Sequence, residues 1–317
     1  GMFRFIYLKS LDTSILKKKK MKKSIDIWSL LVVMMVFMAS CSKESDPVFE
    51  FTDPRDGFTP AEDATDEISV LRREFYDETK TFLLFNDTLR HDFIGYDLNG
   101  DKRYSTELLD IKYEVGQSNT VTYKPTYSYL DTPEKCASAV AYLKAFILPH
   151  LSEKLLPFSW FLAGNIYDYN DSGDALSVYA LSGQRSIALA CAQLSRLKTD
   201  AQKQQLANRQ LLIVVQNLAN NNASSFSDFC SVSSSYYSAN LNVPEGQTAT
   251  EHVRELGFVN STNATSYPSQ KNDINAYATL IITYSDEKIE NIYGNYPLII
   301  KKAKMFRTSL EALGYIY

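Results

Sequence analysis

The sequence lacks the short motifs that mark the common classes of enzyme. It has no G-x-S-x-G nucleophile elbow, no phosphate-binding P-loop, no G-x-G-x-x-G fingerprint and no H-E-x-x-H zinc helix. Histidine is scarce, because only His91, His150 and His252 occur. No two of them are four residues apart, so no pair can lie on one face of a helix and coordinate zinc together. We expect surface or hydrogen-bonded histidines, and the sequence predicts no metal ligand, no cofactor and no catalytic residue.

Cysteine is also scarce and is spaced for neither a disulfide framework nor a zinc ribbon. The chain has four cysteines and no C-x-x-C pair. If Cys41 carries lipid, as argued below, then Cys136, Cys191 and Cys230 remain, which is an odd number. One disulfide in an oxidising compartment is possible, but buried free thiols are the simpler expectation. The chain shows no internal repeat and no heptad.

The N-terminal region reads as an export signal. Lys22 and Lys23 precede an apolar run within residues 25–40, and the run ends at Met38-Ala39-Ser40-Cys41. A basic segment before a short apolar segment is typical of a signal peptide. The run is shorter than the roughly 20 apolar residues of a spanning helix. The tetrad resembles a lipobox with Met in place of the usual Leu, so we expect lipidation of Cys41 rather than a transmembrane anchor.

These features divide the chain into four expected segments. Residues 1–20 precede a second plausible start at Met21 and look like a misplaced start, with Gly1 as a tag remnant. Residues 21–40 are the predicted signal peptide. Residues 41–66 are rich in Pro, Asp, Glu and Thr and are expected to form a flexible tether. Residues 67–317 are the predicted folded domain, which is long enough for a sizeable core.

The charge of the exported part is acidic. Residues 1–40 hold eight of the 33 basic and two of the 37 acidic residues, which leaves a net charge of about −10 from Cys41 onward. This balance argues against nucleic acid as a partner and against a polybasic membrane face. The predicted lipid would therefore be the link to the membrane.

Local patterns predict a mixture of helices and strands. Apolar spacing and capping residues indicate helices that begin near Ile68, at Thr132-Pro133-Glu134 with Asp131 or Thr132 as the cap, and over 199–220, 269–284 and 291–313. Strands are indicated at 81–85, 121–129, 158–169 and 176–191, the last two joined by a turn at 170–173. A serine-rich loop is expected over 221–235.

The segment Asp97-Leu98-Asn99-Gly100-Asp101 resembles the start of a calcium loop. Lys102 stands where such a loop needs Gly, and Glu107 falls at position eleven instead of twelve. We therefore favour an ordinary polar turn here.

A nearly continuous apolar run, Leu211 to Val215, is followed by Gln216-Asn217-Leu218-Ala219-Asn220. The run indicates a buried helix, on which Gln216 and Asn220 share one face and Asn217 lies beside them. In the simplest interpretation the amides satisfy each other, and Asn220-Asn221-Asn222 ends the helix because Asn tolerates a left-handed turn.

The order of several segments resembles a known family. After the lipobox come Phe85-Asn-Asp-Thr, the segment 148–157, Trp160-Phe-Leu-Ala-Gly, the amide-bearing helix, Leu256-Gly-Phe-Val-Asn and Asn272-Asp273-Ile274-Asn275-Ala276. From about Ile68 to Tyr317 the chain resembles the substrate import-associated zinc metallohydrolase lipoproteins, also described as zinc-binding metallopeptidases. Genes of that family commonly lie beside a TonB-dependent outer-membrane receptor and its starch-utilisation-type lipoprotein partner.

The departure from the family is as informative as the match. The family's H-E-F-A-H helix would fall on residues 216–220, where Gln216, Asn217 and Asn220 replace the two histidines and the glutamate. Its E-D-F-A-E pattern would fall on 272–276, where only Asp273 survives. Amides donate weakly to zinc and cannot take a proton from bound water. The resemblance therefore implies a degenerate metal site at Gln216, Asn217, Asn220 and Asp273.

These arguments lead to one expectation and one alternative. The fold should be α+β and zincin-like, with a small N-terminal mixed sheet and a mostly helical C-terminal part. We expect a non-catalytic outer-membrane lipoprotein of a Gram-negative bacterium, facing the periplasm or the cell surface. It would bind a peptide or glycan, or serve a TonB-dependent nutrient import system as an accessory component. The alternative is a hydrolase with a rebuilt site that uses Asp273 with acids such as Asp168, Asp171 or Glu255.

Overall fold

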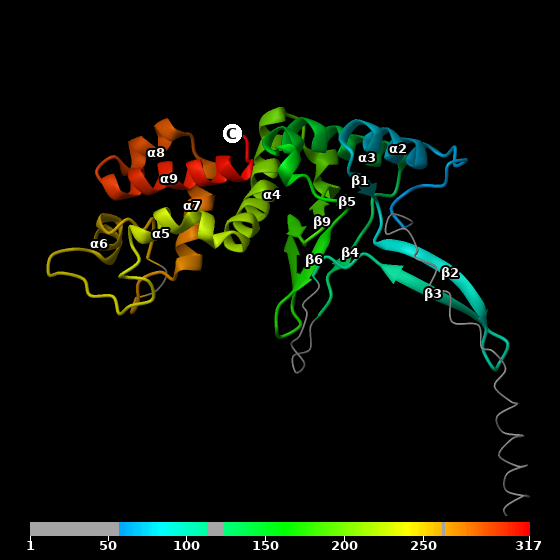
Figure 1. Ribbon diagram of the computed structural model, residues 1–317, viewed down its shortest axis with the longest axis horizontal. Helices are drawn as coiled ribbons and strands as arrows, with labels where there is room; N and C mark the ends of the chain where they lie inside the picture. Colours follow the sequence, from blue (N-terminus) through cyan, green and yellow to red (C-terminus); the bar gives the residue numbers. More distant parts are fainter. Residues whose placement is uncertain (1–56, 113–122, 262–263) are drawn as a thin grey trace, which may run out of the picture. The chain divides into compact units, whose positions relative to one another are not determined.

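A computed structural model describes residues 57–112, 123–261 and 264–317, and it shows an α+β fold, as predicted (Figure 1). The predicted signal peptide and the predicted lipidation site Cys41 lie outside the described residues. The described residues form one compact unit. In the described ranges we find no helix of the length and apolar character needed to cross a membrane.

The central element is a four-stranded mixed sheet in the order β1-β5-β9-β8. Strands β1 (Phe82–Leu84), β5 (Ser159–Ala163) and β9 (Ser186–Ala190) are parallel, and β8 (Ala180–Ser182) pairs antiparallel with β9. Every residue of β5 and β9 is buried. Burial of both faces explains why these strands are almost continuously apolar in sequence.

The alternation of side chains along the strands divides the core into two layers. Trp160 and Leu162 of β5 pack with α3 (Pro133–Tyr142) and α4 (Asp200–Asn221) in the larger cluster, on the face that those helices cover (Figure 1). Phe161 and Ala163 point the other way, into a smaller cluster that includes Phe58. Phe58 lies within the predicted tether and contacts the rings of Phe82 and Phe158.

Two further sheets are small. Strands β2 (Thr88–Tyr96) and β3 (Lys102–Leu108) form an antiparallel hairpin, and β4 (Thr126–Tyr127), β6 (Ile166–Tyr169) and β7 (Ala175–Val178) form a three-stranded sheet. The hairpin turn is the polar turn that we favoured over a calcium loop. Asp97 Oδ1 accepts hydrogen bonds from the backbone N–H groups of Asn99 and Asp101, which stabilises the turn between the two strands.

The C-terminal part is mostly helical, as predicted. It contains α5 (Ser227–Ser231), α6 (Ala249–Glu255), α7 (Gln270–Thr283), α8 (Asp286–Tyr293) and α9 (Pro297–Leu313). The N-terminal helix α2 (Glu67–Thr79) begins at the cap Asp66. Shorter helical segments, one π-helical and the others 3-10 helical, cover Leu143–Ile147, Leu148–His150, Glu153–Leu155, Ala192–Arg196 and Ala223–Phe226.

The structure corrects the two long strands that the sequence indicated. The segment 158–169 divides into β5 and β6, and 176–191 divides into β7, β8 and β9. The first division occurs at Gly164, whose N–H donates to Ser128 O. A Cβ atom at Gly164 would lie 2.7 Å from Ser128 Oγ and 3.0 Å from the backbone oxygen of Tyr129, so this close approach favours glycine. The chain thereby leaves one sheet and enters another.

Two helical predictions are also corrected. The predicted helix 291–313 is two helices, because Pro297 takes the first turn of α9 and disfavours helical conformation at the residue before it. The predicted loop 221–235 is largely helical, because Phe226 and Phe229 are fully buried and bring the segment onto α9. The hairpin β2–β3 and the helix α6 were not predicted.

The three described cysteines are buried free thiols, as expected. Burial raises the pKa of Cys136 to about 11 and that of Cys191 to about 12. Both thiols therefore stay protonated at neutral pH and are poor nucleophiles and poor metal ligands.

Candidate functional site

The predicted amide-bearing helix is α4, and its amides contact α7. Buried Leu211, Val215 and Ala219 hold α4 in the core, and this orientation leaves Gln216 and Asn220 half-buried on the neighbouring face. Asn220 Nδ2 donates to Asn275 Oδ1 at 2.8 Å and to the backbone oxygen of Gln216 at 2.7 Å. Gln216 Nε2 donates to Asn275 O at 3.4 Å. The amides of α4 are therefore satisfied mainly by α7, not by each other.

Helix α4 ends among Asn220, Asn221 and Asn222, as predicted, but the helix is terminated by a different mechanism. The helix ends at Asn221, and Asn222 has a φ of −119°, so it is not left-handed. Leu218 O accepts both the backbone N–H of Asn222 at 3.1 Å and its side-chain Nδ2 at 2.8 Å, so Asn222 closes the last turn of the helix twice. Asn217, which follows Gln216 on α4, is also half-buried.

Asp273 and Asn275 project from different sides of α7. Successive residues of an α-helix are separated by about 100°, so two positions differ by about 200°. Asn275 faces the amides of α4, whereas Asp273 is buried on the side toward α9. Among the positions implied by the family resemblance, Gln216 and Asn220 come together through Asn275, and Asp273 engages a different set of partners.

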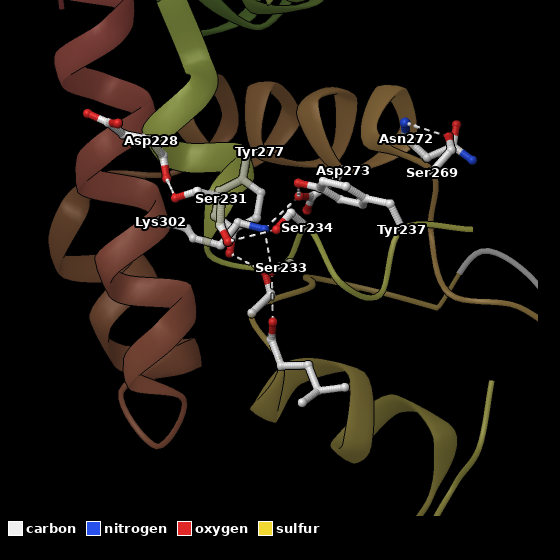
Figure 2. Close-up of polar contacts among 12 residues, drawn as sticks. Asp228, Ser231, Ser233, Ser234, Tyr237, Ser269, Asn272, Asp273, Tyr277 and Lys302 are labelled. Atoms are coloured by element: carbon white, nitrogen blue, oxygen red, sulfur yellow. Dashed lines mark hydrogen bonds and ion pairs between the residues drawn. The ribbon is translucent and has the colours of Figure 1, made fainter. Parts of the chain in front are cut away.

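The partners of Asp273 form a buried polar network (Figure 2). Lys302 Nζ of α9 lies 2.5 Å from Asp273 Oδ2, and the hydroxyl of Tyr237 donates to the same oxygen at 2.7 Å. Lys302 also donates to Ser233 Oγ at 3.0 Å, and Ser233 donates to Leu256 O. Both charged side chains have 0% exposure. The network joins α7, α9, the segment after α5 and the end of α6.

Burial shifts the pKa of each group in the direction of its neutral form. Burial raises the pKa of Asp273, against the opposing effects of Lys302 and Tyr237, and burial lowers the pKa of Lys302. Asp273 Oδ1 is buried without a hydrogen-bond partner among the described residues, which further disfavours the carboxylate. A carboxyl group held in this way is neither an accessible general base nor a free metal ligand.

A cavity of about 300 Å³ adjoins the amide cluster. Its polar lining comes from Gln216, Asn260, Asn272, Asp273, Asn275 and Thr279, and its apolar lining from Phe258, Val259, Pro268 and Ala276. The single carboxyl group in this lining is paired with Lys302, so the cavity has little net charge. Side-chain amides supply both hydrogen-bond donors and acceptors.

A second cavity, of about 310 Å³, lies at the start of α3. Its charged lining residues are Asp131, Glu134 and Lys135, and Lys135 Nζ pairs with Asp131 Oδ1 at 2.6 Å. Sequence reasoning did not find this cavity, because its other walls come from distant segments around Ser128, Gly164 and Ser195. Its charged groups include no histidine, and Cys191, which also lines it, has a raised pKa.

The other acids considered for a rebuilt site lie on separate elements. Asp168 of β6 accepts two hydrogen bonds from Lys112 Nζ, at 2.7 and 2.9 Å, and Glu255 accepts from Gln247. Asp171 belongs to the turn between β6 and β7. The hydrogen-bond partners of Asp273, Lys302 and Tyr237, do not include any of these acids.

The described residues contain no group of three or more His, Cys, Asp or Glu side chains that could hold a metal ion. Each histidine has a hydrogen-bond partner, as expected. His91 pairs with Thr106, His150 with Ile316 O and His252 with the hydroxyl of Tyr267.

Three residues of this region were not identified from the sequence. Asn275 was part of a quoted motif but had no assigned role, and Tyr237 belonged to no motif. Lys302 did leave a signal, because it falls three residues after Ile299 and four before Phe306, on the apolar stripe of α9. A lysine at such a position requires a buried acidic partner.

Comparisons with known proteins gave no match. No family model, no curated protein and no solved structure has significant similarity to this chain.

Removal of either charge of the buried pair is expected to destabilise the fold strongly. Lys302→Met leaves Asp273 without its cationic partner, and Asp273→Ala leaves an uncompensated lysine, so each should lower the free energy of unfolding by about 3–5 kcal/mol. Urea denaturation followed by circular dichroism measures this loss. Lys301→Met, at the exposed neighbouring position, is the matched control and should change stability by less than about 0.5 kcal/mol. Equal stabilities of Lys302→Met and Lys301→Met would contradict this expectation.

Proposed function

We propose that the chain is a non-catalytic, metallopeptidase-like lipoprotein that binds a small polar ligand beside its amide cluster. The observation that carries the proposal is the set of contacts made by Gln216, Asn220 and Asn275 where a zinc peptidase would need imidazole and carboxylate groups. In this proposal the α+β architecture is zincin-like, and α4 corresponds to the zinc-binding helix.

The chemistry of the amides supports binding rather than hydrolysis. A catalytic zinc site needs three strongly donating ligands and an open position for water. Here one amide oxygen, Asn275 Oδ1, already accepts a hydrogen bond from Asn220 Nδ2. The nearby carboxyl group, Asp273, is committed to Lys302 and Tyr237. Nothing in this set can lower the pKa of a water molecule or remove its proton.

The cavity fits a neutral ligand rich in hydrogen-bonding groups. A short peptide segment or a glycan has this chemistry, and about 300 Å³ lies at the lower end of the range of small-ligand sites. A strongly charged ligand is disfavoured, because the cavity has little net charge with which to compensate it.

In the same proposal the protein is tethered to the outer membrane by lipid on Cys41 and works beside a TonB-dependent receptor and its lipoprotein partner. The lipobox and the acidic composition of the chain from Cys41 onward support this proposed location at the outer membrane. The order of motifs supports the association with nutrient import.

The absence of a working zinc site can be tested directly. Protein purified without chelator is expected to contain less than about 0.1 zinc per chain, since carboxamides are poor ligands for zinc. Inductively coupled plasma mass spectrometry measures the occupancy, and hydrolysis of labelled casein measures peptidase activity. One zinc per chain, or hydrolysis that is lost in Asp273→Asn, would favour the rebuilt hydrolase instead.

Binding at the cavity can be tested with defined probes. A panel of tripeptides and trisaccharides at millimolar concentration should include at least one that raises the melting temperature, since a ligand of the native state stabilises it. Thr279→Trp should abolish that shift, because Thr279 is exposed at the cavity rim. The matched control is Thr308→Trp, since Thr308 is also exposed and also donates to the carbonyl four residues earlier. A wild-type protein that no probe stabilises, or binding that survives in Thr279→Trp, would contradict the proposal.

Lipidation is tested in a Gram-negative host fed with an alkyne-labelled fatty acid. The wild type is expected to carry the label and to fractionate with the outer membrane, whereas Cys41→Ser should lose the label and become soluble. Cys136→Ser changes a buried thiol and is expected to keep the label. Label retained in Cys41→Ser would show that this cysteine is not the lipidation site.

A further inference from the structure

Lys302 and Asp273 are held at contact distance, and both side chains are buried. Nζ lies 2.5 Å from Oδ2, both side chains have 0% exposure, and Ser233 Oγ fixes Nζ from a second direction at 3.0 Å (Figure 2). The carboxyl carbon Cγ is one bond from the contacted oxygen. The amine and the carboxyl group are therefore already assembled as two reactants in one cage.

The walls of this cage are aromatic. Nζ lies 4.5 Å from the ring centre of Phe229, 4.9 Å from that of Tyr277 and 5.1 Å from that of Phe258. All three rings are fully buried. The ring faces attract the ammonium form of Lys302, but burial removes the hydration of both charges, which shifts the pair toward a neutral amine beside a neutral carboxylic acid. The opposite pKa shifts of the two groups agree with this direction.

The third component is the hydroxyl group of Tyr237, which donates a hydrogen bond to the oxygen that would leave. The hydroxyl of Tyr237 donates to Asp273 Oδ2 at 2.7 Å, whereas Oδ1 has no partner among the described residues. Tyr237 is thus placed to pass protons to Oδ2. Asp273 Oδ1 is left as the oxygen that would become an amide carbonyl.

We propose that Lys302 and Asp273 condense to an intramolecular amide bond that joins α9 to α7. The lone pair of the neutral amine attacks Cγ of the protonated carboxyl group, and a bond forms between Nζ and Cγ. The bond between Cγ and Oδ2 breaks, and Oδ2 leaves as one water molecule that carries one proton from the carboxyl group and one from the amine. No electron is transferred, so no oxidant or reductant is needed.

Two physical effects favour the product. Two reactants held in contact within one folded chain can reach effective concentrations of about 10⁵–10⁸ M when their reacting atoms are aligned, which offsets the cost of amide condensation. The product is also neutral, so it removes the desolvation penalty of the ion pair. The bond would close a loop between two residues that are 29 positions apart in sequence, and it would lock the C-terminal helices together.

The test is the mass of the intact chain and of its fragments. The folded full-length protein is expected to be lighter than its calculated mass by one water molecule, and its protease digest to contain a branched peptide with Asp273 joined to Lys302. Lys301→Met should keep the loss of water, and Lys302→Met should abolish it. Because the wild-type mass and digest decide the question alone, the test stands even if Lys302→Met does not fold.

Tyr237→Phe separates a chemical role of the hydroxyl from a structural one. This variant keeps the ring, and it should form the bond at least about 100-fold more slowly after refolding, the lower range for loss of a general acid. Recovery of Asp273 and Lys302 only in separate linear peptides would overturn the proposal. A loss of water traced by fragmentation to another position, such as Asp56-Gly57, would also overturn it.

Discussion

The burial of Lys302 against Asp273 constrains the whole C-terminal part of the fold. A lysine with no exposed surface needs a partner within hydrogen-bond reach, and Asp273 supplies it only if α7 turns that residue toward α9. The side chain of Asn275, about 200° further around the helix, then faces α4. The same rotation of α7 therefore sets both the buried charge pair and the amide cluster at Gln216 and Asn220.

Elements with local signals were predicted well. Helix α3 begins at Pro133 with Thr132 as its cap, and α4 begins with a capping box at Thr199, because a cap depends on residues within one turn. The β2–β3 hairpin was missed, because its strands carry a mixed pattern in which Phe93, Tyr96 and Tyr104 are largely exposed. The division at Gly164 was missed as well, because its cause is a contact with distant Ser128.

The candidate site was predictable only in part, for the same reason. The periodicity of α4 placed Gln216 and Asn220 on one face, and the structure agrees. The identity of their partner is a matter of how α7 packs on α4, and no local pattern contains that information. Lys302 is the exception, because a charged residue on the apolar stripe of a helix predicts a buried partner even when the partner is unknown.

The amide side chains of Gln216, Asn220 and Asn275 keep open a cavity that apolar side chains at these positions would fill. Neutral amides can cross-link α4 and α7 without the desolvation penalty of a charge, so the two helices stay fixed in the absence of metal. Leucine or phenylalanine at these positions would pack into the adjoining space of about 300 Å³, because close packing is favoured wherever apolar atoms meet. The amides leave that space open and line it with hydrogen-bonding groups. In the proposed function, this lining supplies the hydrogen bonds to the ligand.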